Sequence, residues 1–253
     1  MLSRNQAKYI NSLKLSRSRE ELGEFVAEGV KVLGELLSSD WEISKIFALP
    51  EWIDANLETL RKKGLDCQEV NEQELKQISQ LSTPNQVLAT VKRPSREIGS
   101  GTDLSGLTIM LDHIQDPGNL GTIIRTADWF GIGQIICSHH TADLFNPKVI
   151  QSTMGSFIRV KVGYTDLRQF LEKLPEQIQV YGSMAGGENI YTTEITKDAI
   201  LIIGNESHGI SPSLLPYLSK RIGIPGSKSG AESLNASIAT AIICAEFYRK
   251  FGE

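Results

Sequence analysis

Short runs of consecutive apolar residues alternate along the chain with stretches in which apolar residues recur every three or four positions. The first pattern is typical of buried strands and the second of amphipathic helices. Within residues 1–92, strands are predicted at 25–27, 43–49 and 87–91, and helices at 30–37 and 51–63. Arg61, Lys62 and Lys63 precede Gly64, as expected at the end of a helix. This part is predicted to be a small α/β domain.

The remaining sequence, residues 103–253, alternates strand and helix patterns more regularly. Strands are predicted at 107–111, 134–137, 158–162, 178–182, 199–203 and 221–224, and helices at 120–130 and 236–251. Strands separated by helices indicate an α/β fold with a parallel sheet and helices on both faces. Residues 93–102 are polar, contain proline and glycine and have no periodicity, so a linker is predicted between the two domains.

Composition restricts the classes of protein that this chain can represent. Apolar residues make up 40% and charged residues 22%, as in ordinary globular proteins. No apolar run approaches the ~18 residues needed to span a bilayer, and the polar, basic start is unlike a signal peptide. We therefore expect a cytoplasmic protein with no membrane partner. Cys67, Cys137 and Cys244 are too far apart for a disulfide framework or a zinc site, and no metal is expected.

The charge distribution leaves the question of a nucleic-acid partner open. A net charge of −4 argues mildly against one, because such proteins usually carry a basic footprint. Residues 1–19, however, contain five basic residues and no acidic one: Arg4, Lys8, Lys14, Arg17 and Arg19. This segment is either a solvated basic arm or an arm that contacts phosphates, whose binding would weaken with salt.

In parallel sheets, ligands bind beyond the carboxyl ends of the strands, and three predicted strands end in unusual sequence. After the first strand, Asn119 is predicted to cap the next helix, and Arg125 lies within that helix among mostly apolar residues. Asn119 has the alternative interpretation of a plain helix cap. For Arg125, the alternative interpretation is a structural ion pair with Asp128 or Asp112.

The other two segments are loops rich in small residues. Gly204-Asn205-Glu206-Ser207-His208-Gly209 follows an apolar strand, and its glycines permit close approach of the backbone to a ligand. Ser211-Pro212 is predicted to begin a helix directly afterwards. The third segment extends from Ile224 to Asn235 and leads into an alanine-rich helix. Taken alone, each segment has the alternative interpretation of an ordinary loop.

Together the three segments resemble the signature motifs of the SpoU/TrmH branch of the SPOUT RNA methyltransferases. The matching parts are Asn119 with Arg125, the segment 204–209, and the segment 224–235, in the same order and spacing across residues 103–253. Residues 1–92 resemble, less specifically, the ribosomal-protein-like domain that binds substrate in these enzymes, through 25–29 and 83–87. The resemblance implies a trefoil-knotted catalytic domain, a homodimer and S-adenosylmethionine as cofactor.

The resemblance further implies methylation of a ribose 2′-hydroxyl in RNA, and the N-terminal domain favours ribosomal RNA over transfer RNA. It assigns catalysis to Asn119, Arg125, Glu206, Ser233 and Asn235, and cofactor binding to Gly204, Asn205, Gly209, Ile224, Ser233 and Leu234. Because guanidinium stays protonated, we expect Arg125 to stabilise alkoxide charge rather than to act as a base, with Glu206 holding it by a charge-assisted hydrogen bond.

Three alternatives remain open: a transfer-RNA ribose methyltransferase, a base methyltransferase of the same superfamily, and a non-catalytic RNA- or ribosome-binding protein. A dinucleotide-dependent oxidoreductase is disfavoured, because Gly-x-Gly-x-x-Gly does not follow the first strand of residues 103–253.

Overall fold

The computed structural model describes residues 1–81, 83–94, 104–227 and 232–252. The chain forms two compact units, each of which is described by itself. The first contains Met1–Ser95 and Asp143–Ile158, and the second contains Arg96–Ala142 and Arg159–Glu253. Most of the expected linker, 93–102, lies outside the described residues, and the domain boundaries drawn from the sequence stay a prediction.

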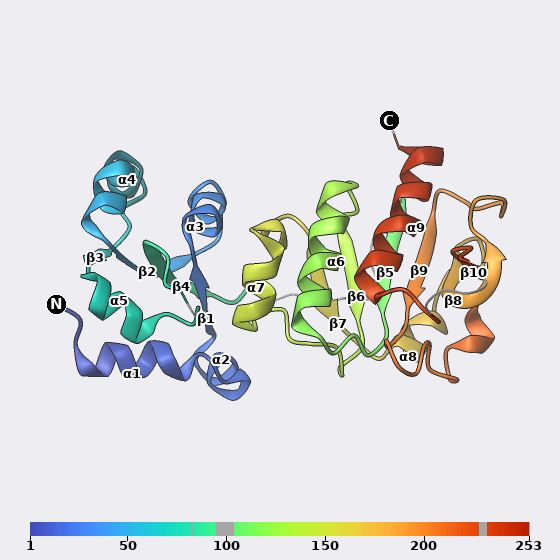
Figure 1. Ribbon diagram of the computed structural model, residues 1–253, viewed down its shortest axis with the longest axis horizontal. Coiled ribbons are helices and arrows are strands. Elements are labelled where there is room, and N and C mark those ends of the chain that lie inside the picture. The colour runs from blue at the N-terminus through green and yellow to red at the C-terminus, as the bar shows by residue number, and fades with distance from the viewer. Residues whose placement is uncertain (82, 95–103, 228–231, 253) are drawn as a thin grey trace. The chain divides into compact units, whose positions relative to one another are not determined.

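The first unit is built on a four-stranded mixed sheet in the order β1-β4-β2-β3. Its elements are α1 (Arg4–Ser12), α2 (Ser16–Leu22), β1 (Glu24–Glu28), α3 (Val30–Leu37), β2 (Ile43–Ala48), α4 (Pro50–Lys63), β3 (Cys67–Glu69), α5 (Glu72–Ile78) and β4 (Val87–Lys92). Strand β4 is antiparallel to both β1 and β2, and β3 is parallel to β2. All five elements predicted in this part are present (Figure 1), and the sequence pattern missed α1, α2, β3 and α5.

An aromatic cluster centred on Phe25 of β1 joins the later segment Asp143–Ile158 to this unit. The ring of Phe25 lies 4.8 Å from that of Phe145 and 5.9 Å from that of Phe157, between centroids. Trp41 completes the cluster with edge-to-face contacts to Phe25 and Phe157. Such aromatic pairs add to the stabilisation from burial alone. The segment, which contains α7 (Pro147–Thr153) and the 3-10 helix η1 (Ser156–Ile158), is thereby part of the core of the first unit.

The basic N-terminal segment is folded rather than an extended arm. Ser3 caps α1 by accepting a hydrogen bond from the N–H of Gln6, and α2 ends at Gly23. Arg19 is only 2% exposed, and its guanidinium donates to Asp143 Oδ2 at 2.6 Å and to the carbonyls of Leu13 and Lys14 at 2.8 Å. One of the five basic residues is therefore removed from the set that can meet a phosphate.

The second unit has a six-stranded sheet in the order β10-β8-β9-β5-β6-β7, and every pairing in it is parallel. Its elements are β5 (Leu107–Leu111), α6 (Pro117–Trp129), β6 (Gln134–Cys137), β7 (Lys161–Tyr164), α8 (Leu167–Leu171), β8 (Gln179–Asn189), β9 (Ala199–Ile203), the 3-10 helix η2 (Leu215–Tyr217), β10 (Lys220–Gly223) and α9 (Ala236–Phe251). The predicted parallel α/β sheet is confirmed, and strand β9 and helix α9 begin and end where the sequence predicts.

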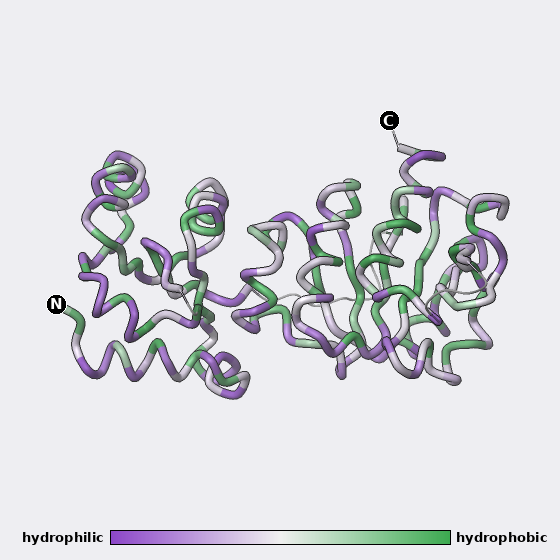
Figure 2. Tube along the Cα trace, viewed as in Figure 1, coloured by the Kyte–Doolittle hydropathy of each residue, from purple (hydrophilic) through white to green (hydrophobic). Residues whose placement is uncertain are grey.

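Helices cover both faces of this sheet. Val180 of β8 packs in one apolar cluster with Leu167 and Leu171 of α8. The next residue, Tyr181, points to the opposite face and contacts Phe247 of α9 with a ring separation of 5.8 Å. Helices α6 and α9 pack side by side on that face (Figure 1). Strand β9 consists of five apolar, buried residues and is coloured hydrophobic (Figure 2), as expected for a strand buried on both faces.

Two helix starts predicted from the sequence are wrong. Helix α6 begins at Pro117, and its cap is Asp116, whose side chain accepts from the N–H of Asn119. Asp116 rather than Asn119 is the N-cap because Asp116 is followed by proline, which is favourable at the first helical position. Ser211-Pro212 starts no α-helix: the described chain continues in turns to η2, and the Ser211 N–H donates to Asp112 Oδ2.

No helix within the described ranges combines the length and the apolar character that a membrane crossing requires.

Arg19→Ala should lower the free energy of unfolding by about 2–3 kcal/mol, because it leaves a carboxylate and two carbonyls without their donor. The expected loss of unfolding free energy is smaller than that for a fully buried ion pair, because the side chain of Asp143 is 28% exposed. Urea denaturation measures the change.

Arg17→Ala is the matched control. Arg17 is 87% exposed and pairs with Glu21 within one helix, so its loss should cost less than about 0.5 kcal/mol. Equal effects of the two substitutions would contradict the structural role of Arg19.

Candidate active site

The register of the parallel strands brings the first two sequence segments to one edge of the sheet. Leu111, the last residue of β5, lies opposite Ile203 of β9 and Cys137 of β6. The loops that begin at Asp112 and Gly204 therefore leave the sheet side by side, as the carboxyl ends of adjacent parallel strands must.

A chain of side-chain hydrogen bonds joins one residue from each of the three segments. Asn235 donates from Nδ2 to Oδ1 of Asn119 at 2.9 Å. Asn119 in turn donates from Nδ2 to Oε1 of Glu206 at 2.6 Å. These residues are separated by 116 and 87 positions in sequence, so only the tertiary fold unites them. Glu206 and Asn235 are exposed and Asn119 is half-buried, so a substrate can reach this group from solvent.

The loop after β9 is a tight, internally bonded turn. Asn205 and Gly209 exchange two backbone hydrogen bonds of 3.0 and 2.9 Å. The Asn205 side chain accepts from the N–H groups of Ser207 and His208. A Cβ added at Gly204 would lie 2.2 Å from the carbonyl carbon of Gly209, so no larger residue fits there. This arrangement presents Glu206 at the tip of a rigid loop.

Asp112 holds the two neighbouring loops together, a role that the sequence analysis did not assign. It is 2% exposed, its N–H donates to the Ile203 carbonyl at 2.9 Å, and its Oδ2 accepts from the Ser211 N–H at 2.7 Å. A carboxylate directly after a buried strand was the signal available in the sequence.

Arg125 lies apart from this hydrogen-bonded chain. It follows Asn119 by six positions on α6, which corresponds to about 9 Å along the helix axis and a different face. Its side chain is exposed and makes no hydrogen bond or ion pair with any residue that the structure describes. The alternative ion pairs are not formed, because Asp128 pairs with Arg159 at 2.7 Å and Asp112 is bonded to Ser211.

The expected hydrogen bond between Glu206 and Arg125 is also absent from the described residues. Glu206 accepts from Asn119 instead, since Asn119 lies in the first turn of α6, beside the loop that carries Glu206. Asn119, Glu206 and Asn235 are thus brought together, whereas Arg125 is not brought to them within one chain.

The remaining predicted residues flank this group. Ser233 and Leu234 are exposed immediately before α9, and Leu234 keeps 48% of its surface accessible. Asn235 is the cap of α9, accepting from the N–H groups of Ser237 and Ile238. Ile224 directly follows β10 and is half-buried. The segment between 224 and 235 is described except for residues 228–231.

The two buried cysteines, Cys137 and Cys244, are poorly placed for thiol chemistry. Burial raises the pKa of the Cys244 thiol to about 12 and raises that of Cys137 as well. A thiol with so high a pKa is neither a nucleophile nor a ready metal ligand. Among the residues with described placement, no group of three or more His, Cys, Asp or Glu side chains is arranged to hold a metal ion.

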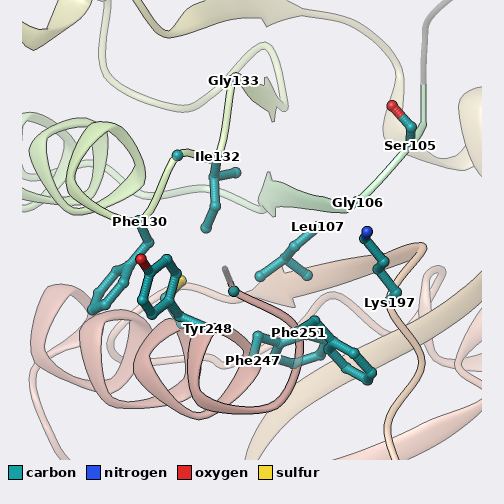
Figure 3. A pocket seen from close by; sticks show the side chains of 13 residues that line it. Ser105, Gly106, Leu107, Phe130, Ile132, Gly133, Lys197, Phe247, Tyr248 and Phe251 are labelled. Atoms are coloured by element: carbon teal, nitrogen blue, oxygen red, sulfur yellow. The ribbon is translucent and has the colours of Figure 1, made fainter.

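A cavity of about 290 Å³ lies elsewhere on the second unit (Figure 3). Phe130, Tyr248 and Phe251 line it together with Leu107, the first residue of β5. The cavity is therefore at the amino end of β5, whereas the three motifs gather at the carboxyl end. It contributes nothing to the candidate active site.

Comparison with protein families shows the family to which the chain belongs. Residues 106–245 match the SpoU rRNA Methylase family, and residues 4–89 match the MRM3-like substrate binding domain. Because the first match covers more than half of the chain, this protein belongs to the SpoU rRNA methylase family.

Individual relatives match over nearly the full length. The 23S rRNA (guanosine(2553)-2′-O)-methyltransferase RlmP of Bacillus subtilis is 30% identical, and the match covers 91% of each chain. A putative RNA methyltransferase of the TrmH family from Porphyromonas gingivalis superposes with a TM-score of 0.87 at 35% identity, covering 99% of this chain and 100% of the other. An AdoMet-bound rRNA methyltransferase from Sinorhizobium meliloti superposes with a TM-score of 0.86 at 28% identity, covering 99% and 96%.

Gly204→Ala should lower the melting temperature and weaken cofactor binding, because the added methyl group collides with the backbone of Gly209. Differential scanning calorimetry and titration calorimetry with S-adenosylmethionine measure the two effects. Gly133→Ala is the control, since a Cβ at Gly133 has no neighbour within 4 Å. A Gly204→Ala protein as stable as the control would show that the loop is not rigid.

Proposed function

We propose that this protein transfers a methyl group from S-adenosylmethionine to a ribose 2′-hydroxyl of ribosomal RNA. The observation that carries the proposal is the hydrogen-bonded chain Asn235–Asn119–Glu206, which unites the three family motifs at the carboxyl edge of a parallel sheet. Membership of the SpoU rRNA methylase family and the 23S rRNA activity of the Bacillus subtilis relative support the choice of reaction and substrate.

The loops beside this chain have the properties that a nucleoside cofactor requires. Open space surrounds the position of a Cβ at Gly209, and Leu234 presents an exposed apolar surface on the other loop. Gly209 has φ of 68°, so the turn exposes peptide groups rather than a side chain. Gly204, Asn205, Gly209, Ile224, Ser233 and Leu234 would hold the cofactor through backbone groups and apolar contact. When bound, it supplies an electrophilic methyl group on a positively charged sulfur.

The chain's own residues must orient the ribose hydroxyl and receive its proton. Asn119 has both ends of its amide fixed, one by Asn235 and one by Glu206, so its orientation is set before substrate binds. Oε2 of Glu206 has no hydrogen-bond partner among the described residues and would accept a hydrogen bond from the 2′-hydroxyl. Ser233, exposed beside Asn235, would complete the contacts to the ribose. The arrangement supplies positioning and a proton acceptor.

Arg125 is proposed to stabilise the negative charge that develops on the 2′-oxygen. Its guanidinium is exposed and, in the described part of the chain, uncommitted to any carboxylate. It shares one face of α6 with Trp129, four positions later, and this face is separate from that of Asn119. We infer that Arg125 reaches the reacting ribose where two copies of the chain meet.

The second copy would cover the exposed faces of α6 and α9. Trp129 is 83% exposed, Ile238 49% and Tyr248 46%, although all three are large and apolar or aromatic. These side chains belong to two helices that pack against each other. Exposed apolar surface of this kind marks interaction sites. A homodimer through this face is therefore proposed.

Four further expectations remain proposals. The family resemblance implies that the loops at 204–209 and 224–235 belong to a trefoil knot. The first unit, which matches a substrate-binding domain, is proposed to bind ribosomal RNA in preference to transfer RNA. A cytoplasmic location and a metal-independent reaction are the remaining expectations from the sequence.

Arg125→Ala should lower the rate of methyl transfer at saturating substrates by ~10²-fold or more, the scale for loss of a main electrostatic stabiliser. The melting temperature and the affinity for S-adenosylmethionine should change little, because Arg125 has no hydrogen-bond or ion-pair partner among the described residues. Single-turnover methylation of unmodified 23S ribosomal RNA, followed by detection of 2′-O-methyl nucleosides, measures the rate.

Arg159→Ala is the control for removal of an arginine, since Arg159 is engaged with Asp128. It should lower stability rather than turnover. Near-normal turnover by a folded, cofactor-binding Arg125→Ala protein would remove Arg125 from the mechanism. A wild-type protein that binds RNA but not the cofactor would instead support a non-catalytic role.

Ile238→Glu should convert the protein from a dimer to a monomer, because it introduces a charge into the proposed apolar interface. Light scattering at assay concentration measures the mass. Leu57→Glu is the control, since Leu57 is 39% exposed and belongs to α4 rather than to the proposed interface helices. A monomeric wild-type protein with full activity would refute the dimer.

A further inference from the structure

One residue beside the active site has a strained backbone. His113 has φ of 59°, and within the described ranges only it and Met154 have positive φ without being glycine. This left-handed conformation costs free energy for a residue with a Cβ, and it persists only where the surroundings impose it. His113 comes two positions after the end of β5, in the segment that leads to Asn119.

Two neighbouring loops impose this conformation. The N–H of His113 donates to Ser138 Oγ at 2.9 Å, and its carbonyl accepts from Nδ2 of Asn205 at 2.9 Å. Ser138 is held in turn by Thr141, whose hydroxyl lies 3.1 Å away and donates to the Leu111 carbonyl. The backbone of His113 is therefore fixed from the loops that follow β6 and β9.

The strain places an imidazole at the surface rather than in the core. The His113 side chain is 41% exposed, and its ring centroid is 4.8 Å from that of His140, with an interplanar angle of 54°. His140 is itself exposed. Because neither ring is buried, packing of the core does not account for the arrangement. Two aromatic rings are instead presented together to solvent.

His113 is linked through Asn205 to the polar chain of the active site. Asn205, which binds the His113 carbonyl, precedes Glu206, which accepts from Asn119. The pair consequently lies at the edge of the sheet where the ribose is proposed to bind, yet neither histidine belongs to the three sequence motifs.

We propose that His113 and His140 form a stacking surface for a nucleobase of the substrate RNA, next to the ribose that is methylated. Proteins read RNA mostly by stacking unpaired bases on aromatic side chains, histidine among them. The proposal rests on the proposed RNA methyltransferase function and adds a contact that would position the target nucleotide.

The local charge favours a base over a phosphate group as the ligand. Oδ1 of the Asp112 carboxylate lies 3.8 Å from Nε2 of His113, and Asp112 is buried. A phosphate at the same place would be repelled by this negative charge, whereas an uncharged base would not.

The test compares His113→Asn, His140→Asn and the double substitution with the wild-type protein. Asparagine tolerates the left-handed conformation, so the backbone at position 113 is retained. The readouts are the KM and kcat for methylation of unmodified 23S ribosomal RNA transcribed in vitro, the Kd for the same RNA by filter binding, and the Kd for S-adenosylmethionine. The double variant should raise the RNA KM and Kd by ~5-fold or more, the scale for losing one stacked base, with the cofactor Kd unchanged.

Two controls identify the interaction. His140→Tyr preserves an aromatic ring and should restore most of the RNA affinity lost in His140→Asn. His139→Asn removes an exposed neighbouring histidine outside the ring pair and should leave the RNA KM unchanged. RNA KM and Kd values for the double variant within twofold of wild type, or an equal effect of His139→Asn, would overturn the proposal.

The design separates this inference from the proposed function. If the wild-type protein methylates no ribose, the proposed function fails, and filter binding still tests the stacking surface. If the wild-type protein methylates RNA and the double variant does so with unchanged KM and Kd, the stacking surface alone is refuted. Should His113→Asn fold poorly, His140→Asn and His140→Tyr decide the outcome without it.

Discussion

The parallel pairing of β5 with β9 is the interaction on which the candidate site depends. Leu111 lies opposite Ile203, so both strands end at the same level and Asp112 and Gly204 begin adjacent loops. Beyond the last paired residues of the two strands, the buried carboxylate of Asp112 accepts a hydrogen bond from the N–H of Ser211 and so keeps the two loops together. Every polar contact between the first and second motifs follows from this register.

The rigidity of the second loop determines what chemistry the edge can perform. Gly204 allows the chain to fold back on Gly209, and the side chain of Asn205 closes the turn from within. Glu206 is consequently held at a fixed place, where it orients the Asn119 amide. Preorganised groups of this kind act on a reaction without further rearrangement, which is how an enzyme with few charged residues at its site can accelerate a methyl transfer.

The first unit shows a different use of charge. The basic N-terminal segment carries five cations, yet Arg19 is buried and bound to Asp143. A segment that is distant in sequence, Asp143–Ile158, thereby joins the core of this unit through both an ion pair and aromatic contacts with Phe25. A count of basic residues along the sequence therefore overstates the number of cations that are available to RNA.

The sequence by itself determined the α/β class, the positions of most strands along the chain, and the residues that carry the motifs. Periodic apolar patterns report local structure, and so β9 and α9 were predicted to the residue. The sequence also placed Asn235 directly before the last helix, where the structure uses it as the helix cap. Asn119 was assigned the same role wrongly, because Asp116 competes for it three positions earlier.

Only the tertiary structure decided which of these residues meet. The bonds from Asn119 to Glu206 and Asn235 join positions 87 and 116 apart, and no local pattern encodes such pairs. Arg125 is separated from Glu206 because of how α6 is rotated against the loop that carries Glu206. The left-handed backbone of His113 depends on hydrogen bonds from two other loops. Local preferences select the elements, whereas long-range hydrogen bonds and strand register select the partners, because those contacts form only when distant segments are packed together.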